Sequence, residues 1–280
     1  MPIALALAAA LTYGAADFFG GLASRRMPAA AVVVLSQIAG IFVLGAAWLA
    51  FPNSAHVHAS DVLLGIGVGI AGGAAIAALY AALAVGRMGV VSPITAVVGA
   101  SVPVIVGLGM GERPAVPALI GVVLAFVAVA LVSANLETRT LSLREPGLVL
   151  ALLSGFAIGV LLVLLSRGHH DGAFVLLAVA RVVSVAVLVA YALVRGESLR
   201  PAPKSLRLVL GAGALDMSAN ILYVFAANSG ALAIVAVLTS LYPASTVFLA
   251  RAFLDERLTR SQWLGVGLAA CGVVLIARYR

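Results

Sequence analysis

Apolar runs long enough to cross a membrane follow one another along almost the whole chain. Of its 280 residues, 64% are hydrophobic and only 10% are charged, whereas soluble domains carry about 25% charged residues. A membrane-spanning helix needs about 20 mainly apolar residues. Ten such runs are predicted, at residues 3–22, 29–51, 62–85, 90–110, 115–134, 147–166, 172–194, 206–228, 231–252 and 261–278. They are too long for barrel strands, so we expect an all-α integral membrane protein of ten transmembrane helices.

The second half of the chain repeats the first at an offset of about 144 residues. "GERPAVPALIGVVLAFVAVALVS" (111–133) then falls on "DERLTRSQWLGVGLAACGVVLIA" (255–277), and Glu112 meets Glu256. This self-similarity over a long period indicates a duplicated structural unit.

Two units of five helices each follow from the repeat, with a boundary predicted between residues 1–135 and 136–280. Since five is odd, the second unit must enter the membrane in the opposite orientation. Inverted repeats of this kind are a frequent design of secondary transporters, which bind substrate near the midplane between the halves.

The features that carry a family resemblance are the ten runs, the duplication, "GERP" after run four, "DERLT" after run nine and the proline of "SLYPAST" (240–246). With these features the chain resembles the EamA-type branch of the drug/metabolite transporter superfamily. The resemblance covers essentially the whole chain. It implies a secondary transporter, by expectation an exporter of small metabolites such as amino acids or related compounds. It does not identify the substrate, because the shared motif belongs to the scaffold.

Ionisable residues inside the predicted helices are few, namely Asp17, Arg181 and Asp216. A charge at the bilayer centre is costly, so each is a candidate functional residue that needs a partner. Arg181 has three possible partners: Asp216, Asp17 or a substrate anion. A bidentate bond to a carboxylate suits its guanidinium. A purely structural Arg181–Asp216 pair is the alternative, and Asp17 is either a proton-linked or substrate-binding acid or a hydrated carboxylate near a helix end.

Six further residues are candidates for the substrate site. Asn220 and Tyr223 share a helix face with Asp216 through their i, i+4, i+7 spacing, and Gln37 is the repeat equivalent of Arg181. The remaining candidates are Tyr13, Tyr80 and Tyr242. Aromatic side chains at these positions suit an apolar or aromatic substrate, and the alternative for each is ordinary core or lipid-facing packing.

Prolines interrupt two equivalent runs, with Pro93 and Pro103 in run four and Pro243 in run nine. A proline inside a helix removes a backbone hydrogen bond, and interrupted helices in corresponding positions of two halves point to a transporter's binding region. Pro243 aligns with Gly99 rather than with a proline, but kinks are expected in both runs.

No catalytic residues, cofactor or metal site are predicted. The chain has no phosphate-binding glycine loop and no hydrolase or metalloprotease motif. His56, His58, His169 and His170 fall in loops, where solvated side chains are the expectation. A membrane-embedded enzyme acting on lipids and a non-transporting helical scaffold are the alternatives to a transporter.

The expected partners are the lipid bilayer and a small-molecule substrate, with the chain a monomer or homodimer. Basic residues are scattered among the loops without runs, which excludes nucleic acid as a partner. Arginine far outnumbers lysine, which indicates a GC-rich bacterial genome and therefore a bacterial inner membrane. The loop charges favour both termini outside the cytoplasm, whereas the family resemblance implies termini inside; both orientations remain open.

Overall fold

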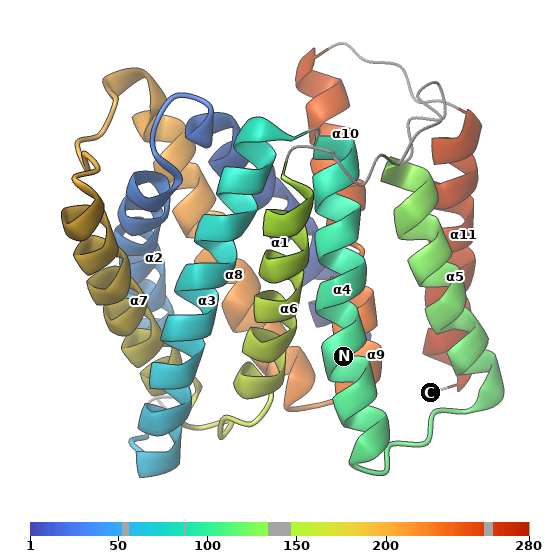
Figure 1. Cartoon of the computed structure of the whole chain (residues 1–280). Helices are drawn as coiled ribbons and strands as arrows, with labels where there is room; N and C mark the ends of the chain where they lie inside the picture. The colour runs from blue at the N-terminus through green and yellow to red at the C-terminus, as the bar shows by residue number, and fades with distance from the viewer. Residues whose placement is uncertain (52–55, 87, 134–146, 255–259, 280) are drawn as a thin grey trace.

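The computed structural model describes residues 1–51, 56–86, 88–133, 147–254 and 260–279, and the ordered elements among them are all helices (Figure 1). The first half contains α1 (Pro2–Ser24), α2 (Ala29–Ala50), α3 (Ala59–Val85), α4 (Met88–Gly109) and α5 (Val116–Ser133). The second half contains α6 (Leu148–Leu165), α7 (Ala173–Arg195), α8 (Leu206–Ala227), α9 (Leu232–Thr239), α10 (Tyr242–Leu254) and α11 (Arg260–Tyr279), with a short 3₁₀ turn η2 (Pro203–Ser205) before α8. The predicted all-α fold is confirmed. The predicted repeat boundary at residue 135 lies outside the described residues and stays a prediction.

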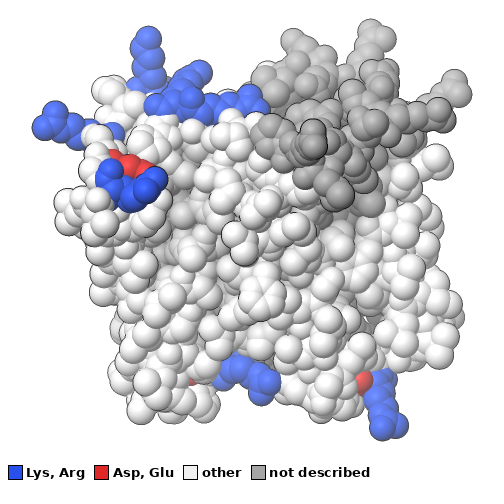
Figure 2. Space-filling model, viewed as in Figure 1, with Lys and Arg blue, Asp and Glu red and all other residues white. Residues whose placement is uncertain are grey.

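The surface of the bundle matches a lipid environment. Within the described residues, six helices are long and apolar enough to cross a membrane, and four shorter apolar helices accompany them. Large apolar side chains stand exposed in mid-helix, among them Phe42 at 76% and Val182 at 65%. In Figure 2 the lysine and arginine side chains lie at the two ends of the bundle, and the belt between them is uncharged in this view. The chain is an integral membrane protein.

The ninth predicted run is divided into two helices. α9 ends at Thr239 and α10 begins at Tyr242, so Ser240 and Leu241 form a turn. Pro243 lies in the first turn of α10, where its missing N–H costs nothing, but further inside a helix it would clash with the carbonyl four residues earlier. The expected interruption is therefore present in run nine. In run four, by contrast, α4 continues without a break from Met88 to Gly109.

The two halves pack on each other by a two-fold exchange. In the repeat, α1 corresponds to α6, α2 to α7, α3 to α8 and α5 to α11. The contact of α1 with α8 is matched by that of α6 with α3, and the contact of α2 with α8 is matched by that of α7 with α3. Helix α5 packs on its own equivalent, α11. Only a two-fold relation between the halves produces these reciprocal pairs. Since the first half contributes five helices, an odd number, the second half runs in the opposite direction, as the inverted repeat predicts.

Glycines allow the closest of these helix contacts. A Cβ on Gly69 would lie 2.6 Å from the carbonyl oxygen of Ala180, and a Cβ on Gly73 would lie 2.6 Å from the hydroxyl of Ser184. A Cβ on Gly213 would collide with the carbonyl oxygen of Ser36. Small residues at such contacts let helix backbones approach within membranes. The contacts bring α7 against α3 and α8 against α2, and so set the positions of the polar residues on α7 and α8.

Candidate functional site

Arg181 lies inside the bundle, on the middle part of α7, and it has two strong partners. Its Nη2 donates to Asp216 Oδ2 on α8 at 2.5 Å, and its Nη1 donates to Gln37 Oε1 on α2. The Arg181 and Asp216 side chains are only 9% and 14% exposed. The Nε2 of Gln37 donates in turn to Ser184 Oγ at 2.8 Å. Of the three partners considered for Arg181, Asp216 is the one observed.

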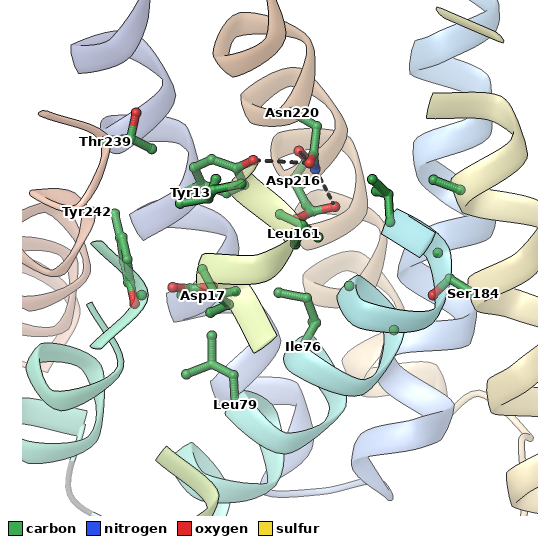
Figure 3. Close-up of a pocket in the computed structure, with 18 of the residues that line it drawn as sticks. Tyr13, Asp17, Ile76, Leu79, Leu161, Ser184, Asp216, Asn220, Thr239 and Tyr242 are labelled. Atoms are coloured by element: carbon green, nitrogen blue, oxygen red, sulfur yellow. Dashed lines mark hydrogen bonds between the residues drawn. The ribbon is translucent and has the colours of Figure 1, made fainter. Parts of the chain in front are cut away.

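The hydrogen-bonded network continues from Asp216 to α1. Asn220, one turn along α8, donates from Nδ2 to Asp216 Oδ2 at 3.2 Å and to the Asp216 carbonyl at 2.7 Å. The Tyr13 hydroxyl donates to Asn220 Oδ1 at 3.0 Å. Figure 3 shows this chain of side chains reaching from α8 across to α1. The network therefore links α1, α2, α7 and α8 through polar contacts between their side chains.

A second group of polar side chains has no such partners. Asp17, one turn from Tyr13 on α1, is 5% exposed, and among the described residues its carboxylate receives no hydrogen bond and forms no ion pair. The buried Thr239 Oγ1 and Tyr242 Oη, on either side of the α9–α10 turn, also have no hydrogen-bond partner in the described part of the chain. In Figure 3 the Tyr242 ring extends toward the Asp17 carboxylate. Buried polar groups are seldom left unpaired, so these three are available to a ligand.

Both groups line one cavity between the two halves. The empty space along its lining measures about 800 Å³, open solvent included. An apolar wall formed by Ile76, Leu79 and Leu161 lies between the two groups of polar side chains (Figure 3). The cavity therefore offers an apolar volume with charge and hydrogen-bonding groups at a few defined places.

Seven of the nine candidates predicted from the sequence line this cavity: Tyr13, Asp17, Gln37, Arg181, Asp216, Asn220 and Tyr242. Tyr80 and Tyr223 are fully packed side chains outside the lining. The Tyr223 hydroxyl donates to the Leu162 carbonyl at 3.0 Å, and the Tyr80 ring fills the space above Gly20. The face shared by Asp216, Asn220 and Tyr223 is thus split between the cavity and a contact with α6.

The sequence prediction did not place three further polar residues of the lining. Ser184 lies one turn after Arg181 and could have been found from that spacing. Thr239 is the last residue of α9, and Ser240 is the first residue of the turn that follows it. Their repeat equivalents include Thr95, whose hydroxyl bonds the Val91 carbonyl of its own helix at 2.9 Å. Thr239, at the end of α9, makes no such hydroxyl-to-carbonyl bond within the described residues.

The cavity is asymmetric although the fold is symmetric. Position by position, Gln37 corresponds to Arg181, Gly72 to Asp216, Ile76 to Asn220 and Leu161 to Asp17, and all eight residues line the cavity. The scaffold does not require a charged residue at these positions, because one of the two equivalent residues is uncharged in every pair. The charged members are therefore features of one repeat and not of the shared scaffold.

Comparison with known families agrees with this architecture. A family model of the EamA-like transporters matches residues 1–134 and again residues 145–278, which together make up nearly the whole chain. The chain belongs to the EamA-like transporter family. Membership makes it a membrane transporter for small molecules and not an enzyme, which decides against the lipid-modifying alternative and against a non-transporting scaffold.

The fold of this EamA-like transporter has a close counterpart among solved structures. A protein of known crystal structure superposes with a TM-score of 0.75, covering 96% of this chain and 95% of its own, at 15% sequence identity. That identity establishes a shared fold and nothing finer. No curated protein is similar enough to the chain to count as a relative.

Proposed function

We propose that this EamA-like transporter exports a small zwitterionic metabolite, such as an amino acid or a related compound, through the cavity between its two repeats. The observation that carries the proposal is the unpartnered carboxylate of Asp17 in the same cavity as the guanidinium of Arg181. We place the protein in a bacterial inner membrane, as a monomer or homodimer.

Asp17 is proposed to hold either a proton or the ammonium group of the substrate. A buried carboxylate without a partner is unfavourable unless it is neutralised. When the cavity is empty a proton performs that neutralisation, and when substrate is bound its cationic group does so. The two states exclude each other, since one carboxylate serves both.

Arg181 is proposed to attract the carboxylate of the substrate. A guanidinium has five N–H donors, and Asp216 and Gln37 together occupy only part of that capacity. Thr239 Oγ1 and Tyr242 Oη supply hydrogen-bonding groups near the Asp17 end. The apolar wall of Ile76, Leu79 and Leu161 suits a short apolar side chain.

Export follows from the exclusive use of Asp17. If proton and substrate compete for one carboxylate, each transport cycle exchanges one for the other. An inward proton gradient then drives substrate outward. Rocking of one repeat against the other, with the α9–α10 turn at the cavity, would expose the site to each side in turn.

Flux through liposomes tests the proposal. The purified chain is reconstituted, labelled neutral amino acids are supplied, and a pH gradient is imposed. We expect wild-type protein to accumulate label on the acidic side, and Asp17→Asn to abolish the dependence on the pH gradient. Thr12→Val, on the same helix and outside the cavity lining, is the matched control and should transport as wild type.

The same experiment distinguishes the alternatives. Flux that responds to neither the pH gradient nor Asp17→Asn would contradict proton exchange at this residue. Transport of anionic or cationic compounds in preference to zwitterions would contradict the proposed substrate class. In both cases the assignment to a transporter family would stand.

A further inference from the structure

Imidazole and carboxylate side chains gather where the α2–α3 loop meets the α6–α7 loop, away from the transport cavity. His58 is the residue before α3 and Asp61 lies in its first turn, while His169 and Asp171 belong to the α6–α7 loop. One ligand atom from each of His58, Asp61 and His169 lies within 4.8 Å of the other two. Only solvated loop histidines were expected here from the sequence, because residues 58 and 169 are remote in the chain.

Asp61 is the fixed member of the cluster. Its side chain is fully buried, and its Oδ1 accepts the backbone N–H of His169 at 3.0 Å. The same oxygen lies 3.2 Å from His169 Nδ1. The protein therefore holds the Asp61 carboxylate in a fixed position beside an exposed imidazole. Such an arrangement suits a metal ligand.

The two histidines face each other across the loops. Their rings stack with centroids 4.3 Å apart, and both side chains are partly exposed, His58 at 37% and His169 at 51%. The Nε2 of His58 is 3.1 Å from Asp171 Oδ1. Histidines that bind metals commonly use their second ring nitrogen to contact a carboxylate in this way, which sets the tautomer and orients the ring.

Repeat symmetry shows that the scaffold does not require these residues. The equivalents of His58, Asp61, His169 and Asp171 in the other repeat are Ala202, Ser205, Arg25 and Met27. These four residues do not form a set of metal ligands, and the positive charge of Arg25 would repel a cation. The cluster is therefore present at one end of the duplicated fold and absent from the symmetry-equivalent place.

We propose that His58, Asp61 and His169 bind a divalent transition-metal ion of the zinc class, with Asp171 orienting His58. Two imidazoles and one carboxylate are a ligand set that zinc favours, whereas calcium and magnesium prefer sets made of oxygen alone. In a tetrahedral zinc site with bonds near 2.0 Å the ligand atoms are about 3.3 Å apart. The His169–Asp61 pair already has that separation, and a ring nitrogen of the partly exposed His58 lies within 4.8 Å of both ligand atoms.

The ion would connect the two repeats at one end of the bundle. His58 and Asp61 belong to the first repeat and His169 to the second, and α3 packs against both α6 and α7 beside them. Exposure of His169 leaves the fourth coordination position to water. Because the bound ion favours the folded state, zinc should raise the thermal stability of the protein.

Direct zinc binding by the full-length protein tests the inference. Tag-free protein in detergent is stripped with a chelator and titrated with zinc against a chromophoric indicator. We expect one zinc per chain, bound at micromolar concentration or tighter and not displaced by millimolar magnesium or calcium. His169→Asn, at an exposed position where folding is safe, should weaken binding at least about tenfold and remove the thermal shift caused by zinc.

His170→Asn is the matched control. His170 follows His169 in the same loop, but its ring packs edge-on against Phe225 with centroids 5.1 Å apart. Zinc binding should be unchanged in this variant. The inference is overturned if wild-type protein binds no zinc, or if His170→Asn weakens binding as much as His169→Asn does.

Discussion

Arg181 donates a hydrogen bond to Gln37, the residue that occupies the same position of the other repeat, 144 residues earlier in the chain. Two symmetry-equivalent residues touch only where they lie close to the axis that relates them. The contact therefore marks the point at which the two-fold axis passes between α2 and α7. An arginine at both positions would place two cations in contact, so a neutral acceptor in one repeat accompanies the guanidinium in the other.

The Arg181–Asp216 pair should be cooperative in stability. Removing one member leaves the other as an uncompensated buried charge, which costs about 3–5 kcal/mol. Arg181→Leu and Asp216→Leu should each lower the free energy of unfolding in detergent by that order, and the double variant should recover most of the loss. Chemical denaturation of the four proteins measures the coupling. An Arg181→Leu protein as stable as wild type would contradict a fully charged, buried pair.

Two tyrosines should respond in opposite ways to loss of their hydroxyl. Tyr223 donates to the Leu162 carbonyl, so Tyr223→Phe should cost about 1 kcal/mol of stability and leave flux intact. Tyr242 lines the cavity, and its buried hydroxyl has no hydrogen-bond partner among the described residues. Tyr242→Phe should therefore leave stability unchanged or higher and reduce flux. Thermal unfolding and liposome flux on the same preparations decide, and equal flux in both variants would remove Tyr242 from the site.

Two glycine-to-alanine changes in helices should differ in sign. A Cβ on Gly213 would collide with the Ser36 carbonyl of α2, whereas a Cβ on Gly45 has nothing within 4 Å. Gly213→Ala should destabilise the protein by about 1–3 kcal/mol through overpacking. Gly45→Ala should stabilise α2 by about 0.5–1 kcal/mol, because alanine is the better helix former. Similar unfolding curves for the two variants would contradict the close approach of α2 and α8.

Glu112 of the "GERP" motif should be important for the start of α9. Its Oε1 accepts the N–H of Leu232 at 2.8 Å and its Oε2 accepts the N–H of Ala233 at 3.0 Å. The carboxylate thus satisfies two free donors at the positive end of the helix. Glu112→Gln should cost about 0.5–2 kcal/mol, measured by thermal unfolding. Arg113→Gln, the exposed neighbour, is the control, and an equal loss there would contradict the cap.

Short segments of the sequence were enough to predict where the helices lie. The length of an apolar run and its bounding residues are properties of a short segment, so the predicted run 29–51 became Ala29–Ala50 and the run 206–228 became Leu206–Ala227. The duplicated "GERP" and "DERLT" segments likewise predicted the repeat and, through the odd helix count, its inversion. Charge in lipid is costly enough that Arg181 and Asp216 were recognisable as site candidates from their positions alone.

Only the tertiary structure decided what those residues contact. Asn220 and Tyr223 share a helix face in the sequence, yet Asn220 reaches the cavity while the Tyr223 hydroxyl donates to the Leu162 carbonyl of α6. His58 and His169 stack although 111 positions separate them in the chain. The position of α8 against α2 depends on close contacts such as Gly213–Ser36, which join segments far apart in the chain and cannot be read from either segment alone.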